Sequence, residues 1–266
     1  MHLTNIVLKA GAQMGRTIAI ANQKGGVGKT TTSVNLSAGL AYLGKKTLLI
    51  DIDPQGNASS GVGINKKEIE GCIYDVLIDD ESMKSYIHET KVENLSIVPA
   101  TMSLAGAEIE LVSAISREIR LKRALDEVKN DYDFIIIDCP PSLGLLTINA
   151  LTASDGVLIP VQCEYYALEG LSQLLSTVRL VQKHLNKDLV IEGVLLTMLD
   201  ARTNLGLQVI EEVKKYFRDK VYKTIIPRNV RLSEAPSHGK PIILYDAKSR
   251  GSDTYLELAR EVIKNG

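Results

Sequence analysis

Short, continuous apolar segments recur along the chain, and each has the length of one buried strand. They lie at residues 16–22, 47–51, 95–99, 134–138, 157–161, 190–196 and 221–226. Ile, Val and Leu dominate these segments, with no regular alternation of apolar and polar residues. This pattern is typical of strands that are buried on both faces, as in a parallel sheet.

Between these strands, apolar residues recur with the spacing of a helix. The expected helices cover residues 30–43, 103–129, 166–184, 204–217 and 252–264. Alternation of strands and helices along the whole chain predicts an α/β fold, with a mainly parallel twisted sheet and helices on both faces. No repeat or linker interrupts it, so residues 15–266 are expected to form a single domain. Ligands of such sheets bind beyond the carboxyl ends of the strands.

Composition agrees with a globular protein. Of 266 residues, 45% are apolar and 24% are charged, and the apolar runs are far shorter than the ~20 residues of a membrane span. The three cysteines are widely spaced without a CxxC pair, so neither a zinc site nor a redox pair is indicated. Reduced thiols fit a cytoplasmic location.

The first 14 residues differ in character from the rest of the chain. They contain a short apolar stretch and one lysine, and they lack the longer apolar region of a secretory signal. We therefore predict that residues 1–14 are a disordered or non-native tail, with Met14 as an alternative natural start.

Charge is unevenly distributed, although the net charge is only −1. Residues 201–250 hold 11 Lys or Arg and 5 Asp or Glu, whereas the remaining chain holds 20 and 27. This basic third suggests an anionic partner such as nucleic acid. A solvated helix face explains the charge equally well at this point.

A glycine-rich segment, KGGVGKTT, follows the first expected strand and opens the next helix. Glycines let backbone N–H groups approach phosphates, and the helix N-terminus adds partial positive charge. Lys29 is placed to neutralise the β- and γ-phosphates, and the Thr30 hydroxyl to bind Mg²⁺. The predicted nucleotide-binding residues are Lys24, Gly25, Gly26, Val27, Gly28, Lys29, Thr30 and Thr31.

The segment departs from the usual phosphate-loop pattern at its start. Gln23 stands where GxxxxGK[ST] has its first glycine, and an additional lysine, Lys24, follows it. A lysine at the loop's entrance can reach a nucleotide held by a second subunit. The pattern KGGxGK[ST] resembles the deviant Walker A ATPases, a P-loop NTPase family that includes partition ATPases, MinD, the nitrogenase iron protein and anion-pump ATPases.

Two of the expected strands end in aspartates. DIDPQ places Asp51 and Asp53 after one strand, and Asp138 ends another within FIIIDCPP. Carboxylates at the carboxyl edge of the sheet can hold Mg²⁺ directly or through water, and Asp138 corresponds to the Walker B position. In the resembling family the second aspartate of DxDPQ orients the attacking water, a role that falls on Asp53. Alternatively, these aspartates cap the adjoining turns.

The resemblance extends over nearly the whole chain from Arg16. Within the deviant Walker A ATPases, it is greatest to the Soj/ParA-type chromosome-partitioning branch. The matching segments are DIDPQGNASSG (51–61), DCPPSLGLLT (138–147), PVQCEYYALEGL (160–171), LLTMLDARTN (195–204) and IPRNVRLSEAPSHGKPI (226–242).

The resemblance implies an ATP- and Mg²⁺-dependent switch. ATP would close two subunits face to face, with Lys24 contacting the partner's phosphates, and the homodimer would bind double-stranded DNA without sequence preference. A ParB-type centromere-binding protein would stimulate hydrolysis, and a replication initiator is a further partner in this family. Pro227 and Asn229 match positions that line the adenine pocket, and Arg202 and Arg231 match positions that touch DNA. The location would be cytoplasmic, on the nucleoid. A surface ion pair is the alternative role of either arginine.

Other functions of the same loop make different demands on the chain. A MinD-like membrane switch needs a basic amphipathic helix with apolar anchors at the C-terminus, and residues 256–266 are mixed in charge. A nitrogenase-type electron carrier needs cysteines that bridge a cluster at the dimer axis, and no cysteine lies where the ligand after the Walker B segment would be expected. A small-molecule kinase or ligase, and a non-enzymatic nucleotide-binding scaffold, remain compatible with the loop itself.

Overall fold

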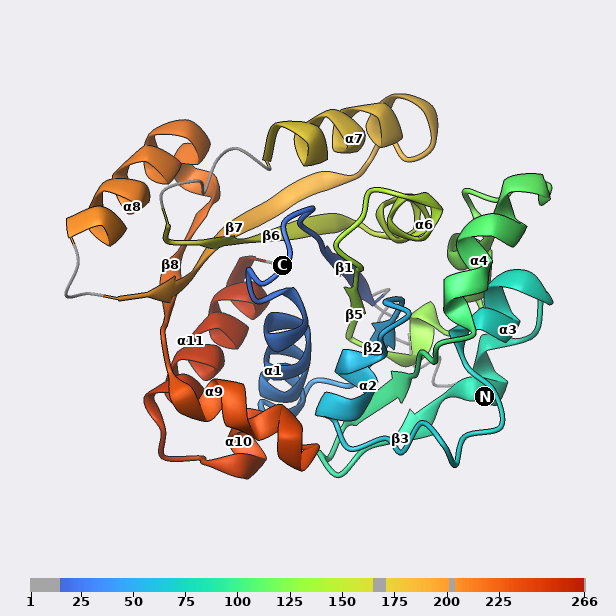
Figure 1. Cartoon of the computed structure of the whole chain (residues 1–266), viewed down its shortest axis with the longest axis horizontal. Coiled ribbons are helices and arrows are strands. Elements are labelled where there is room, and N and C mark those ends of the chain that lie inside the picture. The colour runs from blue at the N-terminus through green and yellow to red at the C-terminus, as the bar shows by residue number, and fades with distance from the viewer. Residues whose placement is uncertain (1–14, 165–170, 201–203, 266) are drawn as a thin grey trace, which may run out of the picture.

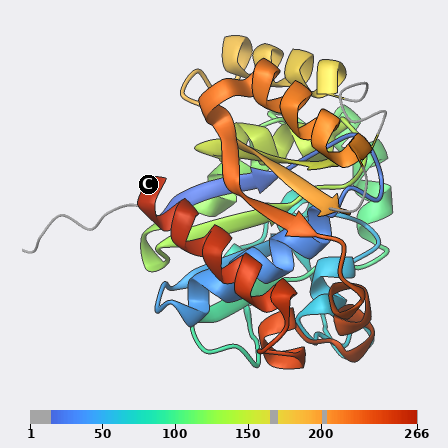
Figure 2. The same cartoon turned by 90° about the vertical axis from the view of Figure 1, so that its left-hand side faces the viewer.

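The computed structural model describes residues 15–164, 171–200 and 204–265, so the predicted tail lies outside it. The strands of these described residues form one sheet in the order β3-β4-β2-β5-β1-β6-β7-β8 (Figure 1). Within it, only β3 is antiparallel to its neighbour. The strands are β1 (Arg16–Ile20), β2 (Thr47–Asp51), β3 (His88–Glu89), β4 (Leu95–Val98), β5 (Phe134–Asp138), β6 (Gly156–Gln162), β7 (Val190–Leu199) and β8 (Val221–Pro227). The side-on view in Figure 2 shows arrowheads pointing to one side, which is the carboxyl edge.

Helices pack on both faces of the sheet (Figure 1). One face is covered by α3 (Ile73–Ile78), α4 (Leu104–Glu110), α5 (Arg120–Asp126), α6 (Leu145–Ala153), α7 (Leu171–His184) and α8 (Asn204–Phe217). The other is covered by α1 (Lys29–Tyr42), α2 (Asn57–Gly61), α9 (Val230–Glu234), α10 (Ile242–Tyr245) and α11 (Arg250–Asn265). Short 3-10 helices are η1 (Met83–Tyr86), η2 (Leu111–Ser113), η3 (Lys129–Asp131), η4 (Arg218–Lys220) and η5 (Ala235–His238).

The two helical layers explain why the strands read as unbroken apolar runs. Along β5, Ile135 and Ile137 pack into one layer and Ile136 into the other, and all three side chains are fully buried. Successive side chains of a strand point to opposite faces, so burial of both faces requires every position to be apolar. The predicted α/β class, with helices on both faces of a mainly parallel sheet, is confirmed.

The predicted single helix over 103–129 is wrong. The segment forms α4 and η2, breaks, and resumes as α5 and η3. Asn149 of α6 enters the break, where its Nδ2 donates to the Arg117 carbonyl (2.7 Å) and its Oδ1 accepts from the Leu121 amide (3.2 Å). Those two backbone groups would bond to each other in a continuous helix. Ser116 completes the break in the left-handed region (φ 55°).

Other differences concern short or featureless elements. The sequence pattern did not predict six elements, which are α2, α3, α6, α9, α10 and β3. Helix α6 is apolar around most of its circumference, so it shows no helical periodicity of apolar residues. The expected helix over 166–184 is described only from Leu171, because residues 165–170 lie outside the described ranges.

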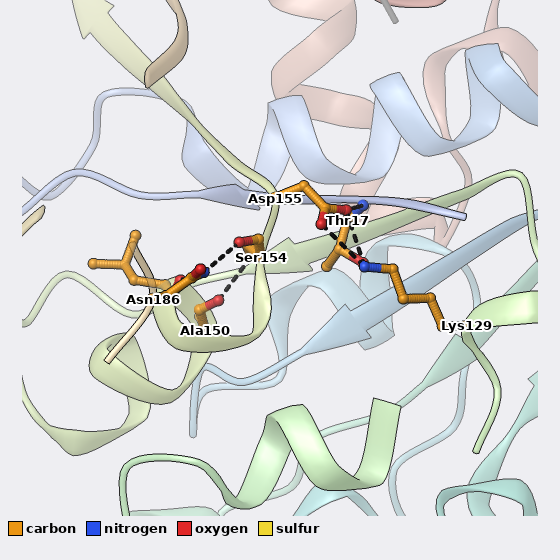
Figure 3. A network of polar contacts seen from close by, with 7 residues as sticks. Thr17, Lys129, Ala150, Ser154, Asp155 and Asn186 are labelled. Carbon is orange, nitrogen blue, oxygen red and sulfur yellow. Dashed lines mark hydrogen bonds and ion pairs between the residues drawn. The ribbon is translucent and has the colours of Figure 1, made fainter. Parts of the chain in front are cut away.

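The amino edge of the sheet is held by a polar network (Figure 3). The carboxylate of Asp155 accepts from the Thr17 amide (2.7 Å) and forms an ion pair with Lys129 Nζ (3.0 Å). Next to it, Asn186 Nδ2 donates to the Ser154 carbonyl (2.7 Å). These contacts fix the start of β1 at the end opposite to its phosphate loop. They explain how the strand is anchored without adding a chemical site.

None of the helices formed by the described residues is long and apolar enough to cross a membrane.

Candidate nucleotide site

The glycine-rich loop joins the carboxyl end of β1 to the N-terminus of α1. Gly26 and Gly28 have positive φ values of 74° and 88°, a conformation that favours glycine, and a Cβ on Gly25 or Gly26 would meet nothing within 4 Å. The loop is fastened from behind, because Thr197 Oγ1 of β7 donates to the Val27 carbonyl (2.8 Å). The exposed glycines thus leave room for an anion on the outer side of a rigidly held turn.

Lys29 lies inside the loop. Its side chain is buried, and Nζ donates to the Lys24 carbonyl (3.1 Å). Burial lowers the pKa of this ammonium group, and the nearby carboxylates of Asp138 and Asp53 act in the opposite direction. The backbone bond holds the cation where a bound phosphate could take over as its partner.

Asp138 faces the start of α1 from the end of β5. Ser33 Oγ donates to its Oδ1 (2.8 Å), whereas the fully buried Oδ2 has no hydrogen-bond partner among the described residues. Burial, followed by the negative charge of Asp51, raises the pKa of Asp138. The Thr30 side chain lies close enough to act on the pKa of this carboxylate, which it lowers. An unpaired buried carboxylate oxygen beside a threonine hydroxyl fits a divalent cation such as Mg²⁺.

The two aspartates of DIDPQ have different environments. Asp51 is wholly buried, and its Oδ2 accepts from the amide (2.8 Å) and the hydroxyl (2.7 Å) of Ser59. These bonds occupy Asp51 in holding α2, so its role is structural. Asp53 lies two residues further along the chain, and its Oδ1 accepts from the Gln55 amide (3.0 Å). Its second oxygen has no hydrogen bond within the described ranges.

A cavity of about 570 Å³ adjoins the phosphate loop. Pro227 and Asn229, which sequence resemblance assigned to the adenine pocket, both line it, and Gly28 and Thr31 form the side next to the loop. The wall is predominantly apolar and has the size of a small-ligand pocket. Sequence reasoning missed its other lining residues, which are Thr197, Met198, Ile226, Arg228, Val230, Leu232, Ser233, Pro236 and Tyr255.

The residues predicted to touch DNA are less completely defined. Arg202 lies outside the described residues. Arg231 is half exposed on α9, and its guanidinium pairs with Glu234 (2.9 Å) and Asp246 (3.5 Å). Exposed pairs of this kind contribute little to stability and can exchange partners in solution. Arg231 is therefore a surface cation that its own chain partly neutralises.

Asp51 and Asp138 are both fully buried, and the charge of Asp51 acts on Asp138. Burial of these two carboxyl groups should lower the free energy of unfolding of the protein without nucleotide. We expect Asp138→Asn to raise the free energy of unfolding by about 1–3 kcal/mol near pH 8, because asparagine keeps the shape of the side chain and removes its buried negative charge. Because the pKa of Asp138 is raised by folding, the native state binds protons more tightly than the unfolded chain. Wild-type stability should fall as pH rises from the unfolded value of about 3.9 through the raised folded value.

Thermal unfolding of both proteins without nucleotide, at pH 6 and pH 8, tests this expectation. The difference between variant and wild type should be smaller at pH 6, where more of the wild-type carboxyl is protonated. An asparagine variant that is less stable than wild type at both values would show that the carboxylate stabilises the empty site.

A family model described as an AAA domain matches residues 15–191. The chain is 78% identical over 253 residues to the sporulation initiation inhibitor protein Soj of Bacillus subtilis, covering 95% of this chain and 100% of that protein. It is 59% identical to the chromosome partitioning protein ParA of Myxococcus xanthus, covering 95% of this chain and 89% of that protein.

Solved structures share the same architecture. Cobyrinic acid a,c-diamide synthase from Mycobacterium smegmatis, with bound ADP and magnesium, superposes with a TM-score of 0.84 and 37% identity, covering 94% of this chain and 95% of that chain. The septum site-determining protein MinD from Pyrococcus horikoshii, complexed with Mg-ADP, gives 0.79 and 28%, covering 94% and 97%. Both solved relatives therefore hold a nucleotide and magnesium on this fold.

Proposed function

The chain belongs to the Soj/ParA family of chromosome-partitioning ATPases, and from this membership we propose that it is a nucleotide-controlled DNA-binding switch. In its ATP state two copies associate and bind duplex DNA without sequence preference. A ParB-type centromere-binding protein stimulates hydrolysis and releases the dimer from the nucleoid. The observation that carries the proposal is the convergence of Lys29, Asp53 and Asp138 on one glycine-rich loop at the carboxyl edge.

The geometry supports a specific distribution of roles around ATP. The amides of residues 25–30 and the Lys29 ammonium cradle the phosphates, and the cavity beside Pro227 and Asn229 receives the base. Thr30 and Asp138 hold Mg²⁺, which neutralises charge on the phosphates. Asp53, whose second carboxylate oxygen has no hydrogen bond to a described residue, orients the attacking water. All of these groups come from turns at one edge of the sheet.

We assign Lys24 a contact with the nucleotide of a second copy. Its carbonyl is held by Lys29 Nζ and its amide donates to Asn22 Oδ1 (3.0 Å), while its side chain makes no hydrogen bond or ion pair with any described residue. The backbone is thus fixed and the ammonium is available. We expect Lys24→Ala to bind ATP normally but to lose the ATP-dependent dimer, because its charge serves the partner's nucleotide.

Light scattering with Mg²⁺ and a non-hydrolysable ATP analogue measures this effect, and a fluorescent nucleotide titration verifies binding. Lys66→Ala is a suitable control, since Lys66 donates to the Gln55 carbonyl (2.7 Å) at the same edge. Normal dimerisation of Lys24→Ala would assign the lysine to its own nucleotide or to no role.

Positive charge in the basic third supports the DNA-binding part of the proposal. The densest group, residues 214–223, holds five basic residues and one acidic residue. Lys214, Lys215, Arg218, Lys220 and Lys223 are all exposed, and none has an ion pair within the described part of the chain. A binder that does not read sequence needs accessible cations more than base-specific side chains.

The decisive experiment is a salt titration of duplex DNA binding with ATP, ADP and no nucleotide. We expect binding only with ATP, no sequence preference and a steep decrease with salt, because counterions are released from the duplex. Arg202→Ala and Arg231→Ala should each weaken binding and flatten the salt dependence while ATP binding persists. If both variants match wild type at every salt concentration, the basic third is a solvated surface, and a small-molecule reaction becomes the better account.

A further inference from the structure

Arg231 is engaged by two carboxylates that come from different segments. On α9 itself, Glu234 Oε2 accepts from Arg231 Nη1 (2.9 Å). Just after the end of α10, Asp246 Oδ2 lies 3.5 Å from Arg231 Nε. Two nitrogens of the guanidinium group therefore face acids of the same subunit, which balance its positive charge.

Glu234 is itself held in place for this contact. Its Oε2 also accepts from the Tyr245 hydroxyl (3.2 Å), and the Tyr245 ring stacks on His238 with ring centroids 5.0 Å apart. The hydrogen bonds from Arg231 and Tyr245 lower the pKa of the Glu234 carboxyl group, so it stays ionised near neutral pH. A carboxylate fixed by several partners competes for an arginine better than a lone surface carboxylate, because it has less side-chain freedom to lose.

The backbone of Arg231 is fixed independently of these ion pairs. The Arg231 amide donates to Asn229 Oδ1 (2.8 Å), which caps the start of α9, and Leu232 and Ser233 of the same helix line the cavity beside the phosphate loop. The Arg231 side chain is nevertheless 55% exposed, so an external anion can reach it. A change of partner by the guanidinium group therefore needs rotation of the side chain and no rearrangement of α9.

We propose that Glu234 and Asp246 are internal counter-ions that compete with DNA phosphates for Arg231 and thereby limit the affinity of the protein for duplex DNA. Each carboxylate occupies a guanidinium nitrogen that could otherwise donate to a phosphate oxygen. DNA binding must therefore exchange carboxylate for phosphate. A freed carboxylate then takes up a cation from solution, which offsets part of the counterion release from the duplex. This inference rests on the DNA binding of the proposed function and adds the acidic residues that set its strength.

The test measures duplex binding by the full chain with Mg²⁺ and a non-hydrolysable ATP analogue, using fluorescence anisotropy over a range of salt concentrations. Glu234→Gln should bind about two- to fivefold more tightly than wild type at low salt, the range typical of one exposed ion pair. Its affinity should also fall more steeply with salt, because no carboxylate takes up a cation when Arg231 moves to a phosphate. Asp246→Asn should act in the same direction and less strongly, since its contact with Arg231 is longer.

Two controls show whether the gain in affinity depends on Arg231. Glu211→Gln removes an exposed carboxylate from α8 in the same basic third, and Glu211 has no ion pair within the described part of the chain. This variant should gain little affinity for DNA. In the double variant, Glu234→Gln should leave the affinity at the level of Arg231→Ala alone. Nucleotide affinity and dimerisation should be the same in every variant.

The competition for Arg231 and the DNA binding itself can fail separately. A gain in Glu234→Gln that disappears in the double variant would support the competition. An equal gain in Glu211→Gln, or a gain that persists without Arg231, would assign the effect to net charge and overturn the inference. Unchanged binding by Glu234→Gln would also overturn it and leave the proposed function intact. A wild-type chain that does not bind duplex DNA with the analogue would contradict the proposed function, and this inference with it.

Discussion

Lys29→Ala is expected to lower the affinity for ATP by on the order of 100-fold, the effect of removing a charge-assisted contact to phosphate. Lys29 Nζ is already desolvated in the folded protein and donates to the Lys24 carbonyl (3.1 Å). ATP binding therefore needs little further desolvation of this ammonium group. Alanine loses both the charge and its fixed position. Lys29→Arg should also bind poorly, because a guanidinium group does not fit the space of an ammonium group.

Isothermal titration calorimetry with Mg²⁺ and ATP measures the loss. Lys91→Ala is the matched control, since Lys91 is an exposed lysine in the turn between β3 and β4. Thermal unfolding without nucleotide separates binding from folding: the Lys29→Ala melting temperature should stay close to that of wild type. Wild-type ATP affinity in this variant would refute the assignment of the phosphate loop.

Much of the candidate site could be predicted because short motifs and parallel topology place it. The sequence KGGVGKTT lies between a strand and a helix, and Asp51 and Asp138 end two strands that pair in register. Parallel neighbours bring their carboxyl ends to one edge whatever the details of packing. Lys29 and Asp138 therefore come together. The negative charge of Asp138 raises the pKa of Lys29, against the lowering effect of burial.

The partners of these residues could not be predicted, because they depend on contacts between distant segments. Ser33 and Ser59 are unremarkable serines in sequence, yet they bind Asp138 and Asp51. Tyr255 of the last helix lines the cavity beside the phosphate loop, and its hydroxyl forms a hydrogen bond with Thr32 Oγ1 (3.3 Å) across 223 positions of sequence. Hydrophobic periodicity reports which side of an element is buried, and it carries no information about which element lies opposite.

The incorrect helix over 103–129 has the same origin. Apolar residues on both sides of the break satisfy helical spacing, so the local pattern predicts one continuous element. A side chain from another helix, Asn149, replaces the backbone bond between Arg117 and Leu121. The break separates α4 and η2 from α5.

Asp53→Ala is expected to slow ATP hydrolysis by roughly 10²–10⁴-fold, the usual contribution of a group that positions or activates the attacking water. Its carboxylate is mostly buried, with Oδ1 held by the Gln55 amide at 3.0 Å and its other oxygen without a described partner. The substitution leaves the glycine loop and Lys29 unchanged, so ATP affinity and dimerisation should persist. Asp53→Asn is the matched variant, because it keeps the size of the side chain and removes its charge.

Single-turnover hydrolysis, monitored after rapid mixing with ATP and Mg²⁺, isolates this step from product release. Both variants should retain ATP and therefore remain on duplex DNA much longer than wild type, which leaves when hydrolysis ends the ATP state. If Asp53→Asn hydrolyses normally and only Asp53→Ala is slow, the side chain positions water through hydrogen bonding without needing its charge. An unchanged single-turnover rate in both variants would contradict the role of Asp53 and direct the search toward residues that a second subunit contributes.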